Sequence, residues 1–184
     1  MIDLLPFTAE NVATVPICRE EILLIVPDEV IHKAYPDRFE EIKKKLYQSA
    51  DVRLLENCPF VLLKKGNRVR TIADELFEDT QITPHIVLET ENIETVLALS
   101  VQGMGITFYP RMFMSSKQNL KAYHDSLMKQ AGLNLFSLNY PRAHGTLAIG
   151  YHKGHYMSRA THEFIRTALE HIPSAAGLPL NTDV

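Results

Sequence analysis

LETENIETVLALSVQGMGITFYP, which runs from Leu88 to Pro110, is the stretch of this sequence that best defines its fold. Its first residues belong to the run HIVLE at 85–89, whose β-branched and apolar residues predict a buried strand. Gly103 is expected to end the helix that follows, and the run ITFY at 106–109 predicts the next strand. That helix is predicted because apolar and small residues recur at intervals of three and four, at Ile93, Val96, Leu97, Ser100 and Val101. Strand, helix and strand in this order form the repeating unit of an α/β fold.

The same alternation extends over most of the chain. Short runs of branched and aromatic residues predict further strands at 22–26, 59–63, 135–138 and 146–151. Three- and four-residue periods and capping signals predict further helices at 37–48, from a Thr71/Asp74 capping box to about Phe77, at 120–131, and from Ser158 to Pro173. The face of the last helix expected to point inward holds Thr161, Phe164, Ile165, Ala168, Leu169 and Ile172. The stretch before residue 22 is expected to be irregular.

Composition excludes several classes of protein. The chain is 46% hydrophobic and 22% charged, which is ordinary for a globular protein and unlike a disordered one. Its net charge of -3 argues against a free-standing nucleic-acid binder. Cys18 and Cys58 lack a C-x-x-C spacing, so buried free thiols in a reducing compartment are expected. Because no signal-peptide pattern and no apolar run of ~20 residues occurs, we expect a cytoplasmic chain with no membrane partner.

Motifs for catalysis, metal binding and cofactor binding are also missing from the sequence. Neither G-x-S-x-G nor H-E-x-x-H occurs, and His152 and His155 share a loop without a third ligand nearby. Gly103-Met104-Gly105 lacks the third glycine of a dinucleotide fingerprint, and a helix rather than a strand precedes it. We therefore expect no catalytic residues, no metal and no cofactor.

Several segments, taken in order, resemble the effector-binding (substrate-binding) domain of LysR-type transcriptional regulators. That family has two Rossmann-like lobes of the periplasmic-binding-protein type 2 kind, joined by two crossing strands. The segments that carry the resemblance are 2–5 (IDLL), 58–63 (CPFVLL) followed by Gly66, Arg70 and Phe77, 88–110, and 147–158 followed by Phe164 and Ile165. The resemblance implies an α/β fold of this kind.

The resemblance also implies an organisation into lobes. Residues 1–26 would form part of lobe one and the first crossing strand, 27–142 lobe two, and 143–173 the returning strand and the C-terminal helix of lobe one; 174–184 would be a flexible tail. The family's winged helix-turn-helix and the first elements of lobe one have no counterpart, so the chain is expected to be N-terminally truncated with an incomplete first lobe. Segment 112–132 is longer than the family's usual connection.

Effectors of this family lie between the lobes, held by hydroxyls and backbone N–H groups near strand ends and helix starts. The resemblance places Thr8 and Thr90 there. We expect the backbone N–H groups near Glu91 and Asn92 to point into the same site, and Arg70, from the basic cluster at 64–70, is a further candidate contact. Thr90 is physically suited to the role, because a helix N-terminus offers unpaired donors and about half a positive charge, which fits a small carboxylate. The alternative is that Thr90 only caps its helix. Likewise, Arg70 could belong to a solvated turn.

The functional expectation is a small-molecule effector-binding domain that regulates transcription and is not an enzyme. As implied partners, we expect an effector, a homodimer or higher oligomer that uses the helix at 92–102, and DNA, bound only through an N-terminal winged helix-turn-helix domain. One alternative is a solute-binding protein of a transporter, which shares the two-lobe architecture. An enzyme of small-molecule metabolism on the same scaffold is a further alternative.

Overall fold

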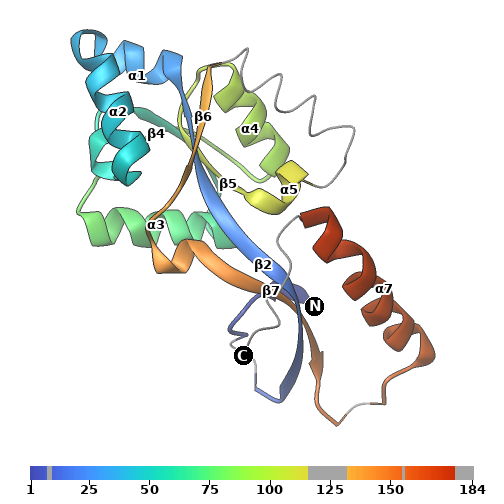
Figure 1. Ribbon diagram of the computed structural model, residues 1–184. Helices are drawn as coiled ribbons and strands as arrows, with labels where there is room; N and C mark the ends of the chain where they lie inside the picture. The colour runs from blue at the N-terminus through green and yellow to red at the C-terminus, as the bar shows by residue number, and fades with distance from the viewer. Residues whose placement is uncertain (8–9, 116–131, 155, 177–184) are drawn as a thin grey trace. The chain divides into compact units, whose positions relative to one another are not determined.

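The computed structural model describes residues 1–7, 10–115, 132–154 and 156–176, and these form two compact units. The described part of unit 1 comes from Met1–Glu21, helix α5 (Arg111–Ser115) and the segment that begins at His144. Unit 2 comes from Ile22–Pro110 and residues 132–143. Strand β2 (Val12–Pro27) contributes its first part to unit 1 and its last part to unit 2 (Figure 1).

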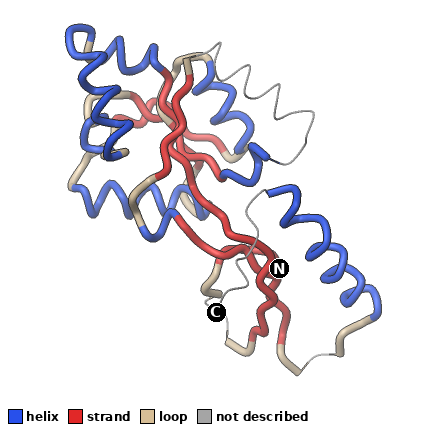
Figure 2. Tube along the Cα trace, in the orientation of Figure 1, coloured by secondary structure: helices blue, strands red, loops and turns tan. Residues whose placement is uncertain are grey.

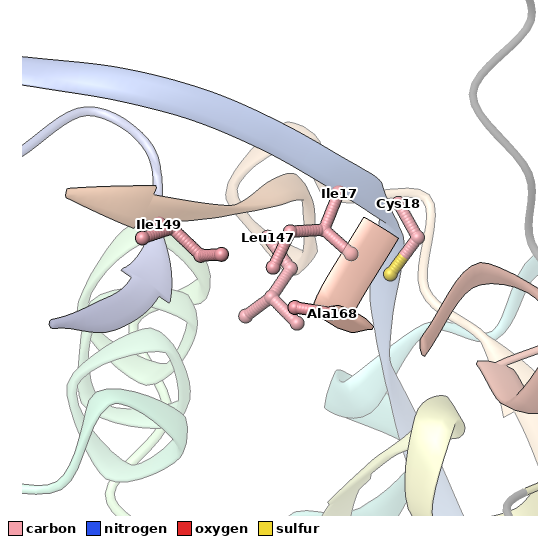
Figure 3. Close-up of a cluster of buried hydrophobic side chains, with 5 residues drawn as sticks. All are labelled: Ile17, Cys18, Leu147, Ile149 and Ala168. Carbon is pink, nitrogen blue, oxygen red and sulfur yellow. The ribbon is translucent and has the colours of Figure 1, made fainter. Parts of the chain in front are cut away.

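Unit 1 is built around a three-stranded antiparallel arrangement. Strand β7 (His144–His152) lies between β1 (Ile2–Leu4) and β2, and Ile149 is in register with Ile2 on one side and Val15 on the other. Helix α7 (Arg159–Ala176) packs on these strands. The buried cluster that results contains Ile17, Cys18, Leu147, Ile149 and Ala168 (Figure 3). Strand β1, expected from the resemblance, is confirmed.

Helix α7 begins where it was predicted, but fewer of its side chains are buried against the strands than predicted. Ser158 Oγ accepts a hydrogen bond from the Thr161 N–H at 3.1 Å, which confirms the cap. The expectation that Phe164 and Leu169 face inward is wrong, because they are 53% and 40% exposed. They flank a narrow stripe that holds Thr161, Ile165, Ala168 and Ile172, and only this stripe meets the strands. The helix also passes the expected end at Pro173, since one missing N–H close to a helix end removes a single hydrogen bond.

Unit 2 is an α/β arrangement. Its strands are the last part of β2, β3 (Pro59–Leu63), β4 (His85–Thr90), β5 (Thr107–Pro110) and β6 (Leu133–Ser137). Its helices are α1 (Asp28–Ala34), α2 (Phe39–Ser49), α3 (Arg68–Thr80) and α4 (Ile93–Val101), with 3-10 turns η1 (Pro36–Arg38), η2 (Val52–Leu55) and η3 (Pro141–Ala143). This architecture confirms the predicted fold class, and the strands predicted at 59–63, 85–89, 106–109 and 146–151 lie within two residues of the observed ones.

Backbone pairing connects the strands of unit 2 to one another. Strands β3 and β4 are parallel, and Phe60 and Ile106 form a parallel bridge that links β3 to the start of β5. Strand β2 then pairs antiparallel with β5 on one edge and β6 on the other, so Leu24 lies opposite both Phe108 and Phe136 (Figure 2). The core beside these strands includes three aromatic rings from β3, α3 and β5.

Those three rings belong to Phe60, Phe77 and Phe108. The ring centroids are 5.1 Å apart for Phe60 and Phe77, 5.7 Å for Phe77 and Phe108, and 6.4 Å for Phe60 and Phe108. All three side chains are buried. Mixed edge and stacked contacts at these distances add to the area that the rings bury, so this cluster anchors α3 to the strands.

Several expectations about boundaries are wrong. Strand β2 begins at Val12, where an irregular stretch was expected, because pairing with β7 organises a segment with many polar residues. Helix α3 begins at Arg68, with its N-cap at Asn67, whose Oδ1 accepts from the Val69 N–H at 2.9 Å; Thr71 therefore lies inside the helix. The seven-residue helix α1 was not predicted, since it is too short to show a period. The helix expected at 120–131 lies outside the described residues.

Replacing Phe60 tests the aromatic cluster. Phe60→Ala removes a fully buried ring, so the free energy of unfolding should fall by about 3–5 kcal/mol. Phe164→Ala, the same change at a 53% exposed position, should cost less than about 1 kcal/mol. Urea unfolding followed by circular dichroism measures both values. Equal losses would contradict the assigned core.

Candidate functional site

The carboxyl ends of β3 and β4 lie together in unit 2, next to the starts of two helices. Leu63 and Thr90, the last residues of the two strands, are in register, and the Lys64 N–H donates to the Thr90 carbonyl at 2.9 Å. Helix α3 starts soon after β3, and helix α4 soon after β4. In open α/β sheets, ligands bind beyond the carboxyl ends of parallel strands, where helix N-termini converge. This edge is therefore the candidate site.

Asn92, rather than Thr90, caps helix α4. Asn92 Oδ1 accepts hydrogen bonds from the N–H groups of Glu94 at 2.8 Å and Thr95 at 3.1 Å. Thr90 Oγ1 accepts a longer hydrogen bond, 3.3 Å, from the Asn92 N–H. Nothing among the described residues accepts the hydroxyl hydrogen of Thr90. The cap that was the alternative role for Thr90 therefore falls to its neighbour, and Thr90 keeps a donor that a ligand can use.

Arg70 ties the start of α3 to both strand ends. Its side chain is only 4% exposed, and Nη1 donates to the Leu63 carbonyl at 2.9 Å and also to Glu89. Its Nε donates to Asp74 Oδ1 at 2.7 Å. The hydrogen bond from Arg70 lowers the pKa of the Glu89 carboxyl. Arg70 is thus already engaged by two carboxylates and one carbonyl, which holds the edge in shape.

The outer part of the edge carries a looser ion pair. Lys64 Nζ lies 3.0 Å from Glu91 Oε1, and these side chains are 57% and 80% exposed. Such exposed pairs contribute less than about 1 kcal/mol, so this pair can open at little cost. When it opens, the Lys64 ammonium becomes available to an anion at the strand ends.

Four of the five residues predicted for the site come together at this edge: Arg70, Thr90, Glu91 and Asn92. Thr8 lies outside the described residues. Sequence reasoning missed the part played by Lys64 and Glu89. Only the register of β3 with β4 brings these two residues to the same edge, although their positions directly after and near the end of predicted strands were a usable signal.

Three of the four cysteines and histidines considered in the sequence analysis, Cys18, Cys58 and His152, lie in the described part of the chain. Cys18 and Cys58 are free and buried, as expected, and burial raises the pKa of the Cys58 thiol to about 12. His152 Nδ1 lies 2.6 Å from the Lys153 carbonyl, and His155 is outside the described residues. Within the described ranges, no three His, Cys, Asp or Glu side chains are grouped to hold a metal ion. No helix in this part of the chain is long and apolar enough to cross a bilayer.

Comparisons with known proteins agree on one family. The family model for the LysR substrate binding domain matches residues 1–173. An uncharacterized HTH-type transcriptional regulator, YcgK from Bacillus subtilis (strain 168), is 29% identical over 119 residues, which cover 61% of this chain and 37% of that protein. The chain thus spans little more than a third of the length of this relative.

Two solved structures show the same fold. The effector binding domain of QuiR in complex with shikimate superposes with a TM-score of 0.61 at 19% identity, over 92% of this chain and 69% of that one. The regulatory domain of CcmR from Synechocystis PCC6803 in complex with 2-PG gives a TM-score of 0.63 at 14% identity, over 92% and 71%. Since the family model covers almost the whole sequence, the chain belongs to the LysR substrate-binding domain family.

Proposed function

We propose that this chain is the ligand-sensing part of a bacterial LysR-type transcriptional regulator and that it binds a small carboxylate at the carboxyl ends of β3 and β4. The observation that carries this proposal is the Thr90 hydroxyl, a donor with no acceptor among the described residues, at the start of a helix capped by Asn92. A helix start carries about half a positive charge, which favours an anion.

The proposed contacts follow from this geometry. Thr90 donates its hydroxyl to the carboxylate, and the backbone N–H groups of Glu91 and Asn92 add donors beside it. Arg70 does not contact the ligand in this proposal but holds the start of α3 against the strand ends, because its guanidinium is already hydrogen-bonded to Glu89 and Asp74. Shikimate, the ligand named for the QuiR domain, is a carboxylate and has the chemistry that this edge would recognise.

The proposed output is a change in how a DNA-binding domain engages its operator in the cytoplasm. A ligand can shift such an equilibrium only by its difference in affinity for two arrangements of the protein. This chain has a net charge of -3 and no helix-turn-helix signal, so we assign DNA contact to another segment of the regulator. The comparisons favour this function over a transporter's solute-binding protein, because the family and its relative YcgK are regulators.

Substitution of Thr90 tests the effector site. A thermal-shift screen of metabolite carboxylates identifies a ligand, which at 100 times its Kd adds ~2.7 kcal/mol to the stability. Thr90→Val keeps the side-chain shape but removes the hydroxyl, and should weaken the binding of that ligand by about tenfold.

Thr71→Val is the matched control for this test. Thr71 is an exposed residue in the first turn of α3, and its hydroxyl is already used, because it donates to the Asn67 carbonyl at 3.2 Å. We expect its affinity for the screened carboxylate to equal that of the wild type. If the two variants bind the ligand equally, the site assignment is wrong.

The surface of α4 and β4 supports a proposed homodimer. Strand β4 is paired only with β3 among the described residues, and its Val87 is 42% exposed. Ala98 on α4 is exposed, and Met104, just after this helix, is 42% exposed. An unpaired strand edge can pair with another chain, and methionine is enriched at interfaces between subunits.

A charge placed at Ala98 tests this interface. Ala98→Arg should convert a dimer into a monomer, measured by light scattering at micromolar concentration, because a long cation would be buried against the partner. Arginine is a good helix former, so α4 should persist. Ala160→Arg, the same change at an exposed position of α7, should leave the dimer intact. A wild-type chain that is already monomeric would refute the proposal.

A salt-series gel shift tests the division between sensing and DNA reading. We expect this chain alone to bind duplex DNA only weakly and without sequence preference, since it offers little phosphate neutralisation. A longer version that includes a helix-turn-helix should shift the promoter beside its own gene. A sequence-specific shift by this chain at physiological salt would contradict the proposed division.

A further inference from the structure

Unit 2 contains a cavity of about 320 Å³ where helices α2 and α3 end. Three parts of the chain surround it: the turn from α2 into η2, the last turn of α3, and the segment that follows β6. This volume is at the lower end of the range for small-molecule sites. Its lining includes Asp51, Val52, Leu76, Asp79, Leu138 and Tyr140.

The apolar part of the lining is suited to a short hydrocarbon. Val52, Leu76 and Leu138 line the cavity and are 2%, 6% and 2% exposed as whole residues, so little of their surface meets bulk water. The gain on binding comes mainly from the ligand, because removing its methylene groups from water is favourable by roughly 25 cal/mol per Å² of apolar surface. The site can therefore hold a ligand with an apolar body.

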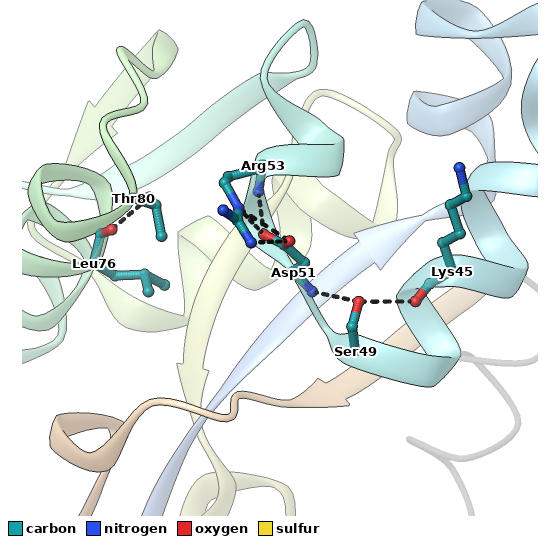
Figure 4. Close-up of polar contacts among 6 residues, drawn as sticks. All are labelled: Lys45, Ser49, Asp51, Arg53, Leu76 and Thr80. Atoms are coloured by element: carbon teal, nitrogen blue, oxygen red, sulfur yellow. Dashed lines mark hydrogen bonds and ion pairs between the residues drawn. The ribbon is translucent and has the colours of Figure 1, made fainter.

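The helix ends give the cavity a negative character. Both α2 and α3 finish here, each before a residue in the left-handed conformation, Ala50 and Gln81. Ser49 Oγ donates to the Lys45 carbonyl at 3.0 Å, and Thr80 Oγ1 donates to the Leu76 carbonyl at 2.6 Å (Figure 4). These hydroxyls satisfy carbonyls one turn back, and each helix C-terminus carries about half a negative charge.

Two carboxylates at this end of the unit, Asp51 and Glu75, are paired with arginines. Asp51 accepts from Arg53 Nε at 2.9 Å and Nη2 at 2.7 Å (Figure 4), and this hydrogen bonding lowers the pKa of Asp51. Glu75 pairs with Arg142 at 2.8 Å. Asp79 has no ion pair of its own, although Arg142 is close enough to interact with it electrostatically.

Asp79 has a hydrogen bond but no ion pair. Its Oδ2 accepts from the Tyr140 hydroxyl at 2.8 Å, and no lysine or arginine among the described residues lies within ion-pair distance of it. Burial, with a contribution from Asp79, raises the pKa of Tyr140 to about 12, so Tyr140 is a neutral donor that leaves the charge of Asp79 in place. The cavity thus combines an apolar floor with one ion pair, Asp51 with Arg53, and one carboxylate, Asp79, that has no ion pair.

We propose that this cavity binds a small organic cation, a primary ammonium group on a short alkyl chain. The ammonium lies at Asp79 and near the two helix ends, and the alkyl chain packs on Val52, Leu76 and Leu138. The site is distinct from the strand ends where we place the effector. Arg70 is in the first turn of α3 and Asp79 in its last, and a helix of this length spans about 20 Å.

The cavity also touches the connection between β6 and β7. Leu138 and Tyr140 belong to that connection, which leads through η3 into β7 of unit 1. A cation bound at Asp79 would therefore lie in contact with this connection. This site stands whether or not the carboxylate proposal holds, because no residue is shared between them.

Titration with n-butylammonium chloride, followed by ¹⁵N amide shifts of the 184-residue chain, tests the proposal. Sodium butyrate and n-butanol, at matched ionic strength, are the ligand controls. We expect saturable shifts at Asp51, Asp79 and Tyr140 and none at Thr90, with a Kd in the millimolar range because the ligand is so small. Asp79→Asn should weaken binding by about tenfold, the loss expected for one charge-assisted hydrogen bond.

Glu78→Gln is the matched control variant. Glu78 and Asp79 are adjacent exposed residues near the end of α3, but only Asp79 lines the cavity, so the loss of Glu78 changes the net charge equally and should not change the affinity. Unaltered amide spectra away from the cavity show that both variants fold. Equal binding of butyrate or butanol, equal affinity in Asp79→Asn and Glu78→Gln, or no saturable shift would each overturn the proposal.

Discussion

Strand β2 pairs with β5 over Ile22–Ile25 and with β6 over Leu23–Pro27, so Leu23–Ile25 are paired on both edges, and the arrangement of unit 2 depends on that double pairing. With β5 on one side and β6 on the other, Leu23–Ile25 have no open edge, and Ile22–Val26 are at most 3% exposed. The earlier part of the same strand pairs with β7 in unit 1. Because side chains alternate along a strand, a slip by one residue would move every side chain of β2 to the opposite face, where it would meet the wrong neighbours. Its register therefore constrains both sheets.

The sequence predicted those elements whose signal is local. Strands β3 and β4 were found because short branched runs end at turn residues, and the end of α4 because Gly103 takes a φ of +70°. The first half of β2 was missed because its polar residues become ordered only by pairing with β7, more than 100 residues later. The helix caps were also placed at the wrong residues. Asn67 and Asn92 cap α3 and α4, whereas Thr71 and Thr90 were considered from the sequence, because threonine is also a good N-cap residue.

The candidate effector edge could be predicted only in part. Thr90 was found by resemblance, and physical reasoning then identified the helix start, with Glu91 and Asn92, as an anion site. The engagement of Arg70 by Glu89 and Leu63 could not be foreseen, because it depends on the register of two parallel strands. Asp79 and Tyr140 gave no signal at all, being 61 residues apart and unremarkable in sequence. Helix α3 thus has an ion-paired arginine, Arg70, in its first turn and a carboxylate without an ion pair, Asp79, in its last.

The two buried cysteines have a practical consequence. Cys18 lies in the core of unit 1 and Cys58 in unit 2, and burial raises the pKa of both thiols. A thiol reagent can reach either one only when the surrounding unit opens, and a thiolate forms only then. Each unit therefore carries its own natural reporter of opening. Pulse labelling with mass spectrometry can time the two events separately in a chain that needs no engineered probe.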